Sequence, residues 1–207
     1  KLKPQDMKTI VQRHLKDHEI VESLCPVDPK TGQHVAHLND LTFYNRQKTI
    51  VLKNCGKVDF NSLEEYIAQD GFRALEQAIC RMTPDEVIEE IKQSGLRGRG
   101  GGGFPTGLKW ALARVSEADD KYVICNADEG DPGAFMDRSL LEGDPYALIE
   151  GMAIGAYAIG AAHGFVYVRA EYPLAIERLS QAIAESQRRG LLGRNIFNSD
   201  FTFELSV

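Results

Sequence analysis

The chain has 207 residues, with 24 basic and 30 acidic side chains, a net charge of −6 and an isoelectric point near 5.4. This acidic balance argues against a dedicated nucleic-acid binder, because binding to phosphate backbones favours a basic face. No apolar run reaches the ~18 residues typical of a membrane helix, and we expect neither a membrane segment nor a secretory leader.

Four cysteines are scattered along the chain, at positions 25, 55, 80 and 125. None belongs to a C-x-x-C pair, and none lies near a histidine at a spacing typical of metal ligands. The sequence therefore predicts no metal site. Unpaired thiols favour a reducing compartment, and we expect a cytoplasmic protein.

The beginning of the chain is polar, with three of the eight prolines and only weak periodicity. We expect a small helical or irregular N-terminal extension over residues 1–45. Residues 46–207 carry much clearer patterns and form the expected second domain.

Strong local signals begin at residues 48–53 (KTIVLK), a run of apolar and β-branched residues that predicts a strand. Ser62 opens a capping box, S-L-E-E, which predicts a short helix that stops at Gly71. A further helix is expected over residues 72–81.

Thr83 caps the next helix, whose first residue is proline, and Gly95 ends it. The pattern then alternates between helices and strands: helix 108–115, strand 121–125, loop 126–143, helix 145–161, strand 165–169, helix 173–189 and strand 201–207. This alternation predicts an α/β fold with a parallel sheet, right-handed crossovers and helices on both faces.

Glycine is crowded into one loop, because seven of the 19 glycines lie between Gly95 and Gly107. Lacking a Cβ, glycine lets a backbone approach a ligand closely and adopt positive φ. Gly98, Gly100 and Gly103 satisfy G-x-G-x-x-G, but a helix precedes them where the Rossmann motif requires a strand. The P-loop pattern is broken too, so we expect a non-Rossmann glycine loop without nucleotide hydrolysis.

The composition of this loop favours a phosphorylated ligand. Successive exposed N–H groups can form an anion-binding nest, and the helix that follows adds its positive N-terminal end. Arg99 and Lys109 supply cationic side chains. Two other interpretations remain open: a purely structural loop, and a disordered Arg-Gly tract that binds RNA.

A second polar segment, NADEGDPG at 126–133, follows the strand predicted at 121–125. Open α/β sheets bind their ligands at the carboxyl ends of strands, which is where this segment lies. Its amide and carboxylate groups can bond to hydroxyl or ring N–H groups of a ligand. Taken alone, the same composition is also typical of a solvated turn.

Together these segments resemble the flavin- and NADH-binding subunit shared by respiratory complex I, NAD-linked and bifurcating hydrogenases and NAD-dependent formate dehydrogenases. The similarity is carried by GLRGRGGGGFPTGLKW and YVICNADEGDPGAFMDR, and it continues through LLEGDPYALIEGMAIGAYAIGA and YVRAEYPLAIERLSQAI. With KTIVLKNCGKVD upstream, it spans roughly residues 45–207. The resemblance implies that residues 46–207 are an FMN- and NADH-binding domain.

The resemblance also assigns roles to individual residues. Those implied to contact FMN are Gly98, Arg99, Gly100, Gly101, Lys109, Asn126, Asp128 and Glu129. Phe104 would stack on the dinucleotide, and Asp131 lies on the NADH side of the site. No catalytic side chain is expected, because the flavin itself carries the redox chemistry.

Two positions on the NADH side depart from the family pattern. Asp131 stands where complex I members usually have glutamate, and Leu112 where an aromatic residue is common. The chain also lacks the family's Cys-Gly-Glu-Glu segment, ubiquitin-like domain and helical domain, whose C-x-x-C-x-x-C run binds a 4Fe-4S cluster. We therefore expect part of a flavin site and no iron–sulfur ligands.

The implied function is that of part of a flavoprotein subunit. It would take a hydride from NADH, or deliver one to NAD, through FMN, and exchange single electrons with iron–sulfur clusters. The implied partners are a thioredoxin-like subunit with a 2Fe-2S cluster and further iron–sulfur, hydrogenase or dehydrogenase subunits. The alternative is a non-catalytic nucleotide-binding or regulatory module that retains the glycine loop; reduction of a bound flavin by NADH would discriminate between the two.

Overall fold

The computed structural model describes residues 2–207, and the chain divides into two compact units, Lys1–Ile50 and Val51–Val207. The first unit begins with a continuous helical stretch made of Pro4–Asp6, α1 (Met7–Thr9) and Ile10–Lys16. Irregular backbone then joins three short helical segments, Glu22–Leu24, Leu38–Asp40 and α2 (Thr42–Asn45). The expected helical or irregular character of the N-terminal segment is thus confirmed.

The carboxylate of Asp28 organises this first unit. Its Oδ2 accepts the backbone N–H and the hydroxyl of Thr42 at 2.7 and 2.5 Å, and its Oδ1 accepts the N–H of Lys30 at 2.7 Å. These hydrogen bonds, led by that of the Thr42 hydroxyl, lower the pKa of Asp28 to about 2. The ionised carboxylate therefore ties its own turn to the start of α2.

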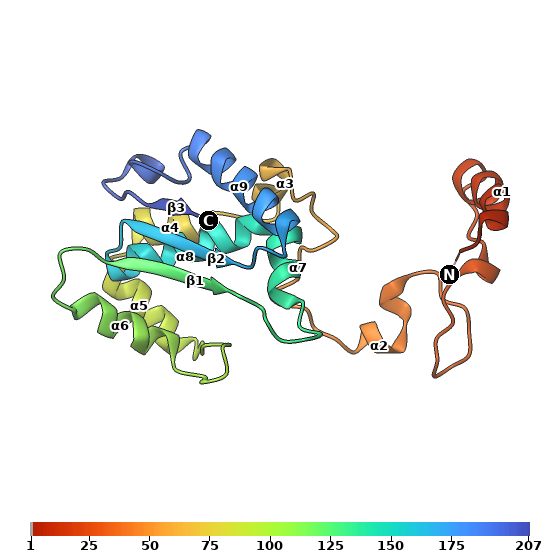
Figure 1. The fold of residues 1–207 in the computed structure, drawn as a ribbon, viewed down its shortest axis with the longest axis horizontal. Helices are drawn as coiled ribbons and strands as arrows, with labels where there is room; N and C mark the ends of the chain where they lie inside the picture. Colours follow the sequence, from red (N-terminus) through yellow and green to blue (C-terminus); the bar gives the residue numbers. More distant parts are fainter. Residues whose placement is uncertain (1) are drawn as a thin grey trace. The chain divides into compact units, whose positions relative to one another are not determined.

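The second unit is built around a parallel sheet (Figure 1). Its helices and strands are α3 (Leu63–Ala68), α4 (Arg73–Arg81), α5 (Pro84–Gln93), α6 (Thr106–Val115), β1 (Tyr122–Ala127), α7 (Met136–Gly143), α8 (Pro145–Ile159), β2 (His163–Val168), α9 (Pro173–Arg188) and β3 (Glu204–Ser206). The strands run in the order β1-β2-β3, with Tyr122 opposite His163 and His163 opposite Glu204. The α/β class and the parallel sheet are confirmed.

Local capping explains where several of these helices begin. Thr83 Oγ1 accepts the N–H of Glu86, whose carboxylate accepts the N–H of Thr83 in return, so the predicted capping box of α5 is present. Ser62 caps α3 through the N–H of Glu65 at 3.1 Å. The Glu65 carboxylate, however, accepts the N–H of Asp59 at 2.8 Å, which extends the cap into the preceding turn.

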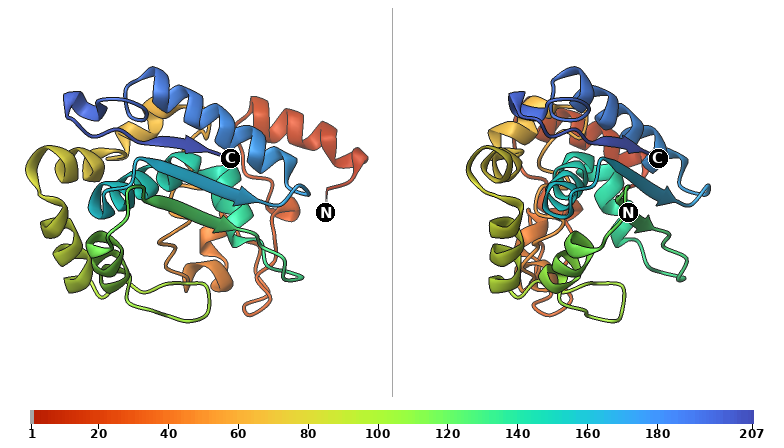
Figure 2. Two further views of the ribbon diagram at one scale, coloured as in Figure 1. Left: turned by 60° about the vertical axis from the view of Figure 1, so that its left-hand side comes forward. Right: turned by 90° about the vertical axis from the view of Figure 1, so that its left-hand side faces the viewer.

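The long helix α8 is the centre of the core. Ile149, Ala153 and Ala156 are fully buried, as its nearly continuous apolar sequence predicts. α8 packs against the strands with α9 alongside it, and α4, α5 and α6 lie on its other sides (Figures 1 and 2). The crossovers from β1 to β2 and from β2 to β3 are right-handed, so both place their helices on the same face of the sheet, the face that α8 covers.

Among the described residues no helix covers the opposite face of the sheet, which corrects the expectation of helices on both faces. Tyr122, Ile124, Phe165 and Tyr167 alternate outward along β1 and β2 and are between 47% and 68% exposed. β1 is therefore a half-buried strand, although its apolar run predicts burial on both sides.

Two further predictions about elements are wrong. Residues 48–53 form turns and irregular backbone instead of a strand, because no neighbouring strand pairs with them; Ile50 is 71% exposed. Residues 136–143, expected as loop, form α7. The N–H groups at the start of α7 are bonded to a carboxylate several residues upstream, a non-local cap that the usual sequence patterns do not reveal.

Candidate functional site

A backbone hydrogen bond joins the two ends of the glycine loop (residues 98–104). The N–H of Gly98 donates to the carbonyl of Phe104 at 2.9 Å. Nη1 of Arg97 donates to the carbonyl of Gly103 at 2.9 Å, so this arginine holds the loop itself. The result is a defined loop, which argues against the disordered Arg-Gly tract.

The tip of the loop presents bare backbone. Gly101 and Gly103 adopt φ of +99° and +60°, a region that residues with a Cβ rarely occupy. A Cβ placed at any position from 100 to 103 would meet no heavy atom within 4 Å. The absence of side chains therefore serves neither packing nor close contact within the chain, and it leaves peptide groups open to a ligand.

Gly107 has a different role from the other glycines of this segment. It lies in the first turn of α6, where a Cβ would come within 2.6 Å of the backbone nitrogen of Lys92 on α5. Glycine thus lets α6 pack closely on α5, which fixes how α6 leaves the loop. Lys109 follows on an exposed part of the first turn of α6, and Arg99 is exposed on the loop.

The acidic loop (residues 126–133) follows β1 directly. Oδ1 of Asn126 accepts the N–H of Asp128 at 3.0 Å, which forms a tight polar turn. Asp128 and Asp131 are exposed, whereas Glu129 is buried. The two carboxylate oxygens of Glu129 accept the N–H groups of residues 137 and 138 at 3.0 and 3.1 Å. Glu129 therefore caps α7, a role that its sequence position does not indicate.

The two loops lie at the same end of the sheet, the end toward which β1 and β2 point (Figures 1 and 2). Both loops therefore face the same end of the second unit, with the sequence-predicted glycines and cations on one loop and the polar groups on the other. It is also the end where open α/β sheets bind their ligands.

Cys125 is the thiol nearest to these polar groups in sequence. Burial, with a smaller contribution from the charge of Asp137, raises the pKa of Cys125 to about 11. The thiol therefore stays protonated near neutral pH and is a poor nucleophile. It packs against the core of the second unit, in agreement with a structural role.

Sequence reasoning missed two residues that contact the acidic loop. Arg169 and Tyr172 come directly after β2, and both donate to the carbonyl of Glu129. The available signal was position: an arginine that follows the second parallel strand lies at the same edge of the sheet as the loop after the first.

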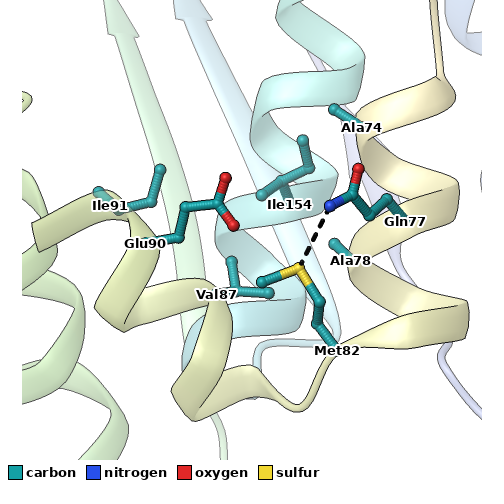
Figure 3. Close-up of a pocket in the computed structure, with 8 residues that line it drawn as sticks. All are labelled: Ala74, Gln77, Ala78, Met82, Val87, Glu90, Ile91 and Ile154. Atoms are coloured by element: carbon teal, nitrogen blue, oxygen red, sulfur yellow. Dashed lines mark hydrogen bonds between the residues drawn. The ribbon is translucent and has the colours of Figure 1, made fainter. Parts of the chain in front are cut away.

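A separate cavity of about 140 Å³ lies between α4, α5 and α8 (Figure 3). Its lining is mostly apolar and includes Met82, Val87 and Ile154, with Gln77 donating to the Met82 sulfur at 4.0 Å. Pockets for drug-sized ligands are about 300–1,000 Å³, so this cavity is too small for a flavin. The candidate site is the pair of loops.

Over the described range, residues 2–207, no helix is long and apolar enough to cross a membrane. Across the same part of the chain, no three His, Cys, Asp or Glu side chains gather as a metal site would require.

The chain belongs to the Nuo51 FMN-binding domain family, whose model matches residues 91–206. It is 55% identical over 166 residues to the HndC subunit of the NADP-reducing hydrogenase of Solidesulfovibrio fructosivorans, covering 80% of this chain and 34% of HndC. It is 49% identical over 158 residues to a subunit of the NADH-quinone oxidoreductase of Rhizobium meliloti, covering 76% of this chain and 38% of that subunit.

Among solved structures, the fold is similar to a chain of the NAD⁺-reducing [NiFe]-hydrogenase in its H₂-reduced state. The TM-score is 0.56 at 26% sequence identity, and the match covers 99% of this chain and 31% of that one. The chain thus spans about a third of the length of the relatives that it matches. The family resemblance predicted from the two loop segments is confirmed.

Proposed function

We propose that this chain is the FMN-binding part of a flavoprotein subunit that takes a hydride from NADH, or delivers one to NAD, and exchanges single electrons with iron–sulfur clusters. FMN would lie between the glycine loop and the acidic loop. The observation that carries this proposal is the unobstructed backbone of residues 100–103, on a loop that faces the same end of the sheet as the acidic loop.

The glycine loop would hold the phosphate end of FMN. Backbone N–H groups of residues 100–103 can approach an anion without interference from side chains, and positive φ at Gly101 turns successive peptide groups. The N–H of Gly98 is already bonded to the carbonyl of Phe104, so Gly98 would shape the loop. Arg99 and Lys109 are both exposed and would supply the positive charge that a phosphate dianion requires. This donor set fits the ligand.

The acidic loop would orient the polar part of the flavin. Because Oδ1 of Asn126 is bonded to Asp128, the Nδ2 group is the donor that Asn126 would offer, and the Asp128 carboxylate is an acceptor. Glu129 would act indirectly, through its cap on α7, since its carboxylate is buried and hydrogen-bonded. On the NADH side, Phe104 is 45% exposed and would stack on the dinucleotide, with Asp131 accepting from hydroxyl groups.

FMN, when bound, supplies both hydride acceptance and one-electron transfer. The side chains of this chain would bind and orient the ligands, and none is required as an acid or base. In the longer protein we propose partners that carry iron–sulfur clusters, including a thioredoxin-like subunit with a 2Fe-2S cluster. The 4Fe-4S cluster of such a flavoprotein would be held outside this chain.

Titration of the purified chain with FMN, followed by quenching of flavin fluorescence, tests this function. We expect saturable binding of one FMN, and loss of binding in Gly101→Val, since valine is strained at φ +99° and places a branched side chain against the ligand. Gly190→Val is the matched control, because Gly190 has φ +70° and open space at the end of α9.

Each other outcome has a defined meaning. Absence of FMN binding by the wild-type chain, or full binding by Gly101→Val, would contradict the proposal. Binding of adenine nucleotides without flavin would favour the non-catalytic nucleotide-binding module instead. Bleaching of bound flavin by NADH without oxygen would exclude that module.

A further inference from the structure

Two side chains of the turn between β2 and α9 donate hydrogen bonds to the backbone of the acidic loop. Nη1 of Arg169 donates to the carbonyl oxygen of Glu129 at 3.0 Å, and the hydroxyl of Tyr172 donates to the same oxygen at 3.3 Å. One peptide group of the loop therefore receives two side-chain donors from a neighbouring strand connection. A carbonyl with two lone pairs can accept both.

The guanidinium of Arg169 is itself fixed in place. Its Nη2 donates to Glu171 at 3.0 Å, and its carbon lies 5.9 Å from the centre of the Tyr172 ring, which is buried. The Arg169 side chain is only 29% exposed. An arginine held by a carboxylate and an aromatic face loses little further freedom when it bonds to the loop.

Arg169 also offsets negative charge in the loop. Its Nε lies 3.7 Å from Oδ1 of Asp128, and two further carboxylates, those of Glu129 and Asp131, follow within three residues of Asp128. Carboxylates gathered near a phosphorylated ligand would repel it, and a fixed guanidinium reduces that repulsion.

Arg169 and Tyr172 act on the acidic loop through Glu129. Its carbonyl is bonded to Arg169 and Tyr172, while its carboxylate is bonded to the first N–H groups of α7. The backbone of Glu129 is thus bonded to the β2–α9 turn, and its side chain is bonded to α7. Its neighbour Asp128 is exposed, and its position follows from that of the Glu129 backbone.

We propose that Arg169 is a positioning residue of the flavin site: it fixes the backbone of Glu129 and balances Asp128, and so sets the affinity of the acidic loop for FMN without touching the flavin. The inference rests on the proposed function. It assigns to the β2–α9 turn a role that neither the glycine motif nor the acidic motif contains.

Hydrogen exchange and FMN titration on the same variants test this role. In Arg169→Ala we expect faster exchange of backbone amides over residues 129–138 in the flavin-free chain, and FMN affinity at least tenfold weaker. Arg169→Lys should recover only part of both, because one ammonium cannot bond at once to the carbonyl and to Glu171 in the same fork. Tyr172→Phe, which removes one of two donors, should have a smaller effect.

Arg73→Ala is the matched control, because Arg73 makes a 3.0 Å ion pair with Asp70 on the exposed start of α4. It should leave both readouts unchanged. Unchanged exchange in Arg169→Ala would overturn the inference. Faster exchange with unaltered FMN affinity would also overturn it, since Arg169 would then stabilise the loop without affecting flavin binding.

The failure of the proposed function is distinguishable from that of this inference. If the wild-type chain bound no FMN, the proposed function would fall and the flavin role of Arg169 with it, whereas exchange would still report whether Arg169 holds the loop. Should Arg169→Ala not fold, Arg169→Lys and Tyr172→Phe provide the same comparison with milder changes.

Discussion

The hydroxyl of Tyr66 on α3 donates to the carboxylate of Glu150 on α8 at 2.6 Å, inside the core of the second unit. The same carboxylate accepts the N–H groups of Phe72 and Leu75 at 2.9 and 3.2 Å, at the start of α4. One buried side chain therefore joins three helices and replaces the local cap that α4 lacks.

This connection predicts a large loss of stability in Glu150→Ala. Three buried donors would lose their acceptor, and we expect a decrease of about 3 kcal/mol in the free energy of unfolding. Tyr66→Phe removes one hydrogen bond and should cost about 1 kcal/mol. Urea denaturation measures both. Glu177→Ala, on an exposed part of α9, should change stability by less than about 0.5 kcal/mol; equal effects at positions 150 and 177 would contradict this account.

Tyr66 also predicts how stability depends on alkaline pH. Burial, followed by the hydrogen bond to Glu150, raises the pKa of Tyr66 well above its usual value of 10.0. Above pH 10 the unfolded chain loses this proton while the folded chain keeps it, so stability should fall as pH rises from there. In Tyr66→Phe that part of the pH dependence should disappear, whereas the exposed Tyr44→Phe should retain it.

Two glycine-to-alanine variants separate close packing from helix propensity. At Gly107 the added Cβ would collide with the backbone of Lys92, and we expect a loss of more than about 2 kcal/mol as α6 moves off α5. At Gly151, in α8, nothing lies within 4 Å of a Cβ, and alanine should stabilise the helix by about 0.5–1 kcal/mol. Thermal unfolding distinguishes the signs, and two losses of similar size would contradict the prediction.

The first unit should be sensitive to acid through Asp28. Its pKa is lowered from 3.8 to about 2, chiefly by the hydrogen bond from the Thr42 hydroxyl. The stabilisation is present above pH 3.8 and is lost as pH falls toward about 2. The amide NMR signal of Thr42 should follow this transition. In Asp28→Asn it should be shifted at all pH values, and a titration near pH 4 in the wild type would contradict the assignment.

The sequence predicted the second unit well where the signals are local. Thr83 and Ser62 cap their helices, Gly95 and Gly190 end theirs with positive φ, and the apolar run of α8 is buried. These features depend on residues only a few positions apart, so the sequence alone is enough to predict them.

The failures share a non-local origin. Residues 48–53 have strand propensity but no strand to pair with. α7 depends on Glu129, eight residues before the first N–H that it caps, and the fixed geometry of the acidic loop depends on Arg169, 40 residues downstream of Glu129. The glycines and cations of the candidate site were visible as a motif, whereas the residues that hold its second loop were not.

The strand order has a consequence for where a ligand can bind. In the described sheet, β1, β2 and β3 lie side by side in chain order, so no reversal of winding opens a crevice between neighbouring strands. The glycine loop instead connects α5 to α6, two helices that pack against each other and against α8. A helix therefore stands in the place that a strand occupies in dinucleotide-binding folds, which is why the glycine spacing alone points to the wrong fold.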